Sequence, residues 1–93
     1  MKQINIKEFE NQVNYNYGAT ALIKLEGLIT TKIEIKNVEI MTDKNHIIIF
    51  DKKDKTKNVL LNKHQIMKIE EPMNETYDIK FDLMQDVRIV VKY

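Results

Sequence analysis

Apolar and polar residues alternate along most of this chain with the two-residue period of a β-strand. Alternating or short apolar runs occupy residues 20–25, 28–41, 46–51, 58–61, 66–70, 77–81 and 87–93. These runs are rich in isoleucine, valine, threonine and aromatic residues, which favour strands, and polar or glycine-containing segments separate them. The pattern predicts a mainly β protein.

The first residues carry a helical pattern instead. Asn5 can cap a helix, and Glu8 stands three residues later, as in a capping box. Apolar residues then follow at spacings of three and four, on one helical face: Ile6, Phe9, Val13 and Tyr17. Gly18 is a residue typical of a helix end. We predict a short helix over residues 6–16 that covers one end of the β structure.

The apolar run 28–41 changes phase in its middle. Isoleucines occupy odd positions up to Ile35, whereas apolar residues occupy even positions from Val38 onward. Because side chains alternate faces with a period of two, the switch at Lys36 and Asn37 requires a bulge or a tight turn. The sequence predicts either one strongly bent strand or two shorter strands.

Residues 46–51 and 58–61 flank a lysine-rich turn and predict a hairpin. One helical turn at 62–65 leads into a closing strand at 66–70, which we expect Pro72 to end. The predicted inward-pointing residues of this region are Ile47, Ile49, Leu60, Ile66 and Ile69.

The tail alternates over 77–81 and again over 87–93, which predicts a second, half-buried hairpin. The 93 residues leave room for one domain, 1–93, and a hydrophobic content of 43% suffices for one core. Cysteine is absent, which excludes disulfides, thiolate zinc sites and cysteine nucleophiles.

The start of the chain has no apolar segment of signal-peptide length, and the longest wholly apolar run, 47–50, is too short to span a membrane. We therefore expect a cytoplasmic protein without a membrane partner. Lysine supplies 14 of the 15 basic residues, and isoleucine and asparagine are abundant. Their AT-rich codons suggest a low-GC bacterium, or one of its phages or plasmids.

Charge is unevenly distributed, although the net charge is only +1. Residues 44–68 hold seven lysines and two aspartates, a net charge of +5, whereas residues 69–86 hold six acids and one lysine, a net charge of −5. The lysine-rich turn could follow a phosphate backbone through Lys52, Lys53, Lys55 and Lys57. The alternative is a solvated hairpin tip, because Asp51 and Asp54 dilute the positive charge and the turn has no arginine.

The other polar groups offer weaker candidates. A metal site would need His46 and His64 together with Asp43 or Asp51, and we expect none. The acids of the C-terminal hairpin could attract a basic protein, or could form the ordinary solvent face of a strand: Glu75, Asp78, Asp82 and Asp86. No nucleophile–base pair, phosphate loop or ligand cluster is visible, so we expect no catalytic residues, no cofactor and no enzyme.

From about residue 5 to 72, the order of helix, strand, Glu26-Gly27 turn, long strand, hairpin, one-turn break and closing strand resembles the Sm-like (Hfq-like) family of small barrels. In particular, residues 63–69 followed by Pro72 are similar to the Lys-His motif and final strand of that family. The resemblance implies rings of subunits that bind RNA, with Lys63 and His64 at the nucleotide pocket. SH3-like barrels share much of this order.

The predicted fold is therefore mainly β (α+β): a short N-terminal helix, a small Sm-like or SH3-like antiparallel β-barrel, and an extra C-terminal hairpin. Our first functional hypothesis is a non-enzymatic, homo-oligomeric module that binds single-stranded RNA or DNA through the loop lysines, Lys63 and His64. The second is an accessory or inhibitory protein of a phage or mobile element. It would bind another protein through its acidic hairpin or a sheet edge.

Overall fold

The computed structural model describes residues 2–93. In chain order their elements are β1 (Lys2–Ile4), α1 (Ile6–Asn14), β2 (Thr20–Glu26), β3 (Thr31–Ile35), β4 (Val38–Thr42), β5 (His46–Asp51), β6 (Asn58–Asn62), the 3₁₀ turn η1 (Lys63–Gln65), β7 (Ile66–Met73), β8 (Thr76–Phe81) and β9 (Asp86–Lys92).

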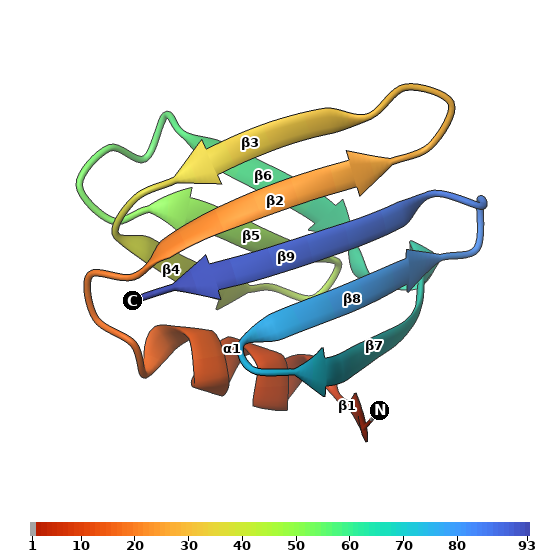
Figure 1. The fold of residues 1–93 in the computed structure, drawn as a ribbon, viewed down its shortest axis with the longest axis horizontal. Helices are drawn as coiled ribbons and strands as arrows, with labels where there is room; N and C mark the ends of the chain where they lie inside the picture. The colour runs from red at the N-terminus through yellow and green to blue at the C-terminus, as the bar shows by residue number, and fades with distance from the viewer. Residues whose placement is uncertain (1) are drawn as a thin grey trace.

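The described strands form two antiparallel sheets, one with the order β1-β7-β8-β9-β2-β3 and one with the order β4-β5-β6 (Figure 1). The smaller sheet lies behind the larger one in this view, and α1 runs below both. The core between them is built largely from β-branched side chains, among them Ile23, Ile35, Ile47, Ile49, Ile79 and Ile89. The predicted mainly β fold with one helix is confirmed.

The predicted phase switch is the point where the chain passes from one sheet to the other. β3 ends at Ile35 and β4 begins at Val38, and Asn37 between them has a φ of +49°. Asparagine tolerates this left-handed conformation better than most residues. The outcome is two shorter strands. Their sheets keep separate hydrogen-bond ladders, and no ladder among residues 2–93 closes them into a barrel.

The predicted C-terminal hairpin is confirmed, but it lies within the larger sheet and is not an extra element at its edge. β8 and β9 lie between β7 and β2 in the larger sheet, and β9 pairs with β2 over seven residues, from Thr20↔Lys92 to Glu26↔Asp86. Val87, Ile89 and Val91 of β9 are buried in the core. The hairpin therefore holds the larger sheet together.

Most of the predicted inward-pointing residues are placed correctly. Ile47, Ile49 and Ile69 are buried, and Ile66 is half-buried against the core. The predicted inward orientation of Leu60 is wrong, since its side chain is 58% exposed. Its neighbours Val59 and Leu61 point inward, and the two-residue period then turns the residue between them outward.

Three further boundaries differ from the prediction. α1 ends at Asn14, so Tyr17 leaves the helical face and is exposed. β7 continues through Pro72 to Met73, with a register shift after Glu70 that accommodates the proline. Residues 2–4, for which no strand was predicted, pair as β1 with β7.

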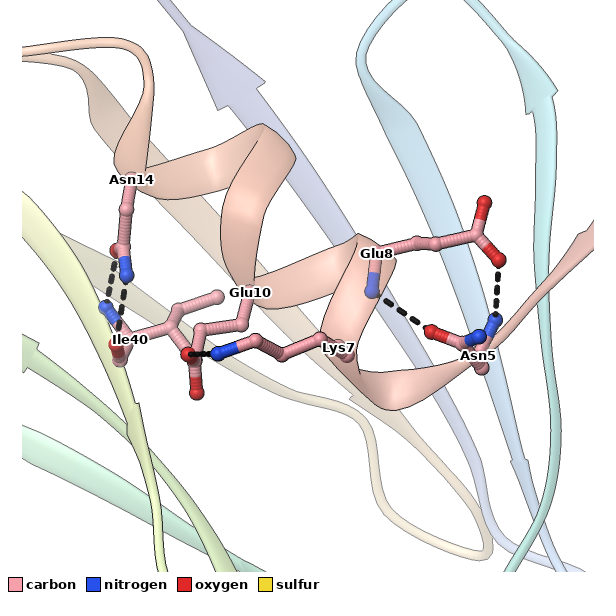
Figure 2. A network of polar contacts seen from close by, with 6 residues as sticks. All are labelled: Asn5, Lys7, Glu8, Glu10, Asn14 and Ile40. Atoms are coloured by element: carbon pink, nitrogen blue, oxygen red, sulfur yellow. Dashed lines mark hydrogen bonds and ion pairs between the residues drawn. The ribbon is translucent and has the colours of Figure 1, made fainter.

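The helix is fixed at both ends by side chains (Figure 2). The Asn5 side chain accepts a bond from the Glu8 N–H at 2.8 Å, and the Glu8 carboxylate accepts one from the Asn5 N–H at 3.4 Å, which completes the predicted capping box. At the other end, the Asn14 amide bonds both backbone groups of Ile40 in β4. Gly18, with a φ of +75°, then turns the chain into β2.

Candidate functional site

The β5–β6 loop carries the four predicted lysines on a turn that its own aspartates organise. The Asp51 carboxylate, which is buried, accepts N–H bonds from Lys53 at 2.8 Å and Asp54 at 3.3 Å. The Asp54 carboxylate accepts a bond from Thr56 Oγ1 at 2.6 Å. All four lysines of this loop are exposed: Lys52, Lys53, Lys55 and Lys57. The aspartates therefore shape the loop and offset part of its charge.

Lys63 and His64 begin the η1 turn at the end of β6. The Asn62 side chain accepts the His64 N–H at 2.9 Å, and His64 Nε2 lies 3.1 Å from Asn45 Oδ1. The pKa of Glu10 on α1 is lowered first by a hydrogen bond from the Thr42 side chain and least by the positive charge of half-buried Lys63. The Lys63 N–H donates to the Asn45 carbonyl at 2.8 Å. Both residues are thus tied into the structure around the β4–β5 turn.

The two parts of the predicted nucleic-acid site lie at opposite ends of one strand. The loop lysines precede β6, and Lys63 and His64 follow it. Lys57 and Lys63 are six residues apart along an extended strand, so their backbones lie about 20 Å from each other. The structure therefore does not bring the predicted residues into one pocket.

The histidines do not form a metal cluster with acids. His46 Nδ1 lies 3.3 Å from Asp43 Oδ1, and Asp51 lies at the other end of β5. Among residues 2–93, no three His, Asp or Glu side chains gather in a way that could hold a metal ion.

The predicted acidic residues do not form a single cluster. Asp78 lies on the solvent face of the larger sheet and forms an ion pair with Arg88, at 2.8 Å between Oδ1 and Nε. Glu75 lies in the turn between β7 and β8. Asp82 and Asp86 flank the β8–β9 turn, at the opposite end of the hairpin. Asp78 and Asp86 line one small hollow on the solvent face of the larger sheet, together with Lys80 and Arg88, and Glu75 is not part of it.

Two neighbouring turns expose large apolar side chains that the sequence did not single out. Leu28 and Ile29 lie in the β2–β3 turn, Leu83 and Met84 lie in the β8–β9 turn, and all four are largely exposed. We call these four residues the tip patch. The two turns lie at the same end of the larger sheet (Figure 1), and together they line a hollow of about 610 Å³. Large contiguous apolar patches on a surface mark interaction sites.

Met84 is difficult to explain by folding alone. Its side chain is 91% exposed, so it contributes little to the core. Its φ of +62° is in the left-handed region, where a residue with a bulky side chain is strained and glycine or asparagine would fit better. Met84 is therefore a strained residue whose side chain lies at the surface.

Acidic side chains lie beside the tip patch. Asp82 and Asp86 flank Leu83 and Met84, and Glu26 precedes the other turn, where it pairs with Lys24 at 3.2 Å. A second hollow, of about 420 Å³, continues from Leu83 toward the exposed Leu60 of β6. The result is an apolar surface with an acidic rim, next to a groove.

A stretch of sequence could have indicated this surface. Turns are normally polar, and the segment 82–86, DLMQD, places two large apolar residues in one. Leu28 and Ile29 were harder to recognise because they extend the apolar run that continues into β3.

No helix within residues 2–93 has the length and apolarity needed to cross a membrane. Comparisons of the chain with protein-family models, with curated proteins and with solved structures gave no match.

Proposed function

We propose that this chain is a non-enzymatic protein-binding module whose tip patch docks onto another protein. The observation that carries the proposal is the exposure of four large apolar side chains on two adjacent turns, one of them the strained Met84. Exposed apolar clusters of this kind supply the central contacts of protein interfaces. An accessory or inhibitory factor of a phage or mobile element, active in the cytoplasm, would act by occupying its partner in this way.

The partner we propose is a different protein with an apolar surface and a basic rim. Two copies of this chain meeting through the same patch would bring four acidic groups, Asp82 and Asp86 of each copy, to the border of one interface. Like charges facing each other across an interface are unfavourable, whereas a basic rim would be attracted. The charge of the rim therefore favours a heterologous partner.

Photo-crosslinking tests this proposal. A photoreactive p-benzoylphenylalanine in place of Ile29 should form an adduct with one discrete protein in extracts of the organism that encodes the chain. The same group in place of Met67, an exposed residue of β7, should not form this adduct. The captured protein, once purified, should bind the unmodified chain. Equal capture from both positions, or no rebinding by the purified protein, would contradict the proposal.

Single-stranded nucleic acid is a second candidate ligand, which one observation favours. Lys52 Nζ lies 5.6 Å from the centre of the exposed Tyr17 ring, beside the other loop lysines. A lysine cluster next to an exposed aromatic ring is the combination that binds stacked bases and phosphates. In this alternative the chain is an Sm-like or SH3-like barrel, and copies assemble through an open sheet edge.

A salt titration tests this second candidate. If the loop binds a labelled single-stranded oligonucleotide, replacing Lys53, Lys55 and Lys57 with glutamine should reduce the slope of log affinity against log salt by about 2. Replacing Lys63 and His64 should change the affinity for the oligonucleotide independently of the loop replacements, because these two residues lie at the other end of β6. Sedimentation analysis measures the proposed assembly. No binding at low salt would remove this candidate.

A further inference from the structure

A further hollow with a different chemistry lies far from the tip patch. It is formed by the end of α1, the β7–β8 turn and the C-terminus, at the opposite end of the larger sheet, and has a volume of about 440 Å³. Its lining includes three of the four tyrosines and two acids: Tyr15, Tyr77, Tyr93, Glu71 and Glu75. We call it the tyrosine pocket.

The tyrosines differ in how firmly they are held. Tyr77 is buried, its hydroxyl donates to Gln12 Oε1 at 2.8 Å, and its ring meets that of Phe9 edge to face, at 5.0 Å between centres. Tyr15 and Tyr93 are 82% and 68% exposed. The pocket therefore has one fixed ring and two accessible rings.

The carboxylates make the pocket electronegative. Neither Glu71 nor Glu75 forms a salt bridge within residues 2–93, and the nearest base by strand register is Lys2, opposite Glu71. The pKa of Tyr77 is raised to about 12, first by burial and then by the negative charge of Glu71 and Glu75. A hydrogen bond to Glu75 raises the pKa of Tyr93.

Aromatic faces and carboxylates both attract cations, and a pocket that combines them suits an alkylammonium or guanidinium group. We propose that the tyrosine pocket binds a lysine or arginine side chain on a basic segment of a partner protein. This site goes beyond the proposed function, since it shares no residue with the tip patch and does not depend on it. Its volume falls within the range of ordinary ligand pockets.

Nuclear magnetic resonance titration with short peptides tests the proposal on the intact chain. The probe is acetyl-Gly-Arg-Gly-Arg-Gly-amide, with a lysine version to separate the two cation sources and a citrulline version as the neutral control. Saturable shifts should appear at the backbone amides of Glu75, Tyr77 and Tyr93 and not at those of Leu28 and Met84. The citrulline peptide should cause no comparable shift, and added salt should weaken binding of the charged peptides.

Matched variants locate the contact. Tyr15→Leu and Glu75→Gln should each weaken binding of the charged peptide about two- to fivefold. Glu34→Gln should leave it unchanged, because this exposed residue lies outside the pocket. Equal binding of the citrulline peptide, shifts confined to other surfaces, or equal effects of Glu75→Gln and Glu34→Gln would overturn the proposal. None of these outcomes bears on crosslinking at the tip patch.

Discussion

The side-chain amide of Asn14 satisfies the outward backbone groups of Ile40, as a neighbouring strand would. Its Nδ2 donates to the Ile40 carbonyl at 2.8 Å, and its Oδ1 accepts the Ile40 N–H at 2.7 Å. One helical residue thus covers the edge of β4, where an open edge would invite pairing with another chain. The residues of α1 therefore serve the smaller sheet as well as the helix.

Replacing Asn14 should lower the free energy of unfolding by more than the small size of its side chain suggests. Asn14→Ala leaves two partly buried backbone groups without partners, so the free energy of unfolding should fall by about 1–3 kcal/mol. Urea denaturation measures the change. Asn11→Ala, at an exposed position of the same helix, should alter stability by less than about 0.5 kcal/mol. Equal stability of the two variants would show that the Ile40 bonds contribute nothing.

Glu10 should make stability depend on acid pH. Its pKa is lowered from the ordinary 4.5, mainly by the hydrogen bond from Thr42, with help from Lys7 and Lys63. The stabilisation from this carboxylate is therefore complete above pH 4.5 and is lost as the pH falls through the lower pKa of the folded state. Unfolding free energies measured from pH 7 to pH 2 should fall less steeply for Glu10→Gln than for the unmodified chain.

Glu34→Gln is the control for that series, since Glu34 is exposed on β3. Its pH profile should match that of the unmodified chain. A Glu10→Gln profile parallel to both would mean that Glu10 has the same pKa in the folded and unfolded states.

At the scale of elements, the hairpin of β8 and β9 carries the clearest consequence. Because it lies between β7 and β2, its removal would break the larger sheet and expose Ile23 of β2 and Ile69 of β7, which lose their partners Ile89 and Ile79. A chain that ends at Asn74 should therefore be unfolded. Circular dichroism and thermal denaturation measure this, and a cooperative transition in the shortened chain would mean that the hairpin is only an appendage to a self-sufficient barrel.

Local patterns predicted most of the elements. The cap at Asn5, the phase switch at Asn37 and the alternation of β8 and β9 each depend on neighbours in the sequence, and each agrees with the structure. The order of strands could not be predicted in this way. Pairing of β9 with β2 joins residues 60 to 72 positions apart, and side-chain periodicity does not specify which strand becomes the neighbour.

The candidate site was less predictable for the same reason. The loop lysines are exposed, as expected of a charged turn, but nothing local places Lys63 at the far end of β6 from them. The tip patch exists only because β2 pairs with β9 and brings two turns together. The tyrosine pocket likewise joins Tyr15 to Tyr93, at opposite ends of the sequence.

At the scale of the whole molecule, the surfaces differ in chemistry. One end of the larger sheet is apolar with an acidic rim, the other end is aromatic and acidic, and the lysines project from the loop of the smaller sheet. Although the net charge is only +1, different parts of the surface therefore carry charges of opposite sign. Partners of different charge would approach different faces.

The most direct test of the account is the dissociation constant of the protein captured at the tip patch. We compare the unmodified chain, Leu28→Ser/Met84→Ser, and the control Met67→Ser/Met73→Ser, whose replaced side chains are exposed on β7. The tip variant should keep the stability of the unmodified chain and bind at least about tenfold more weakly, because central apolar contacts carry most of an interface's energy. The control should bind normally. Unchanged affinity in the tip variant, or an equal loss in both variants, would contradict the account.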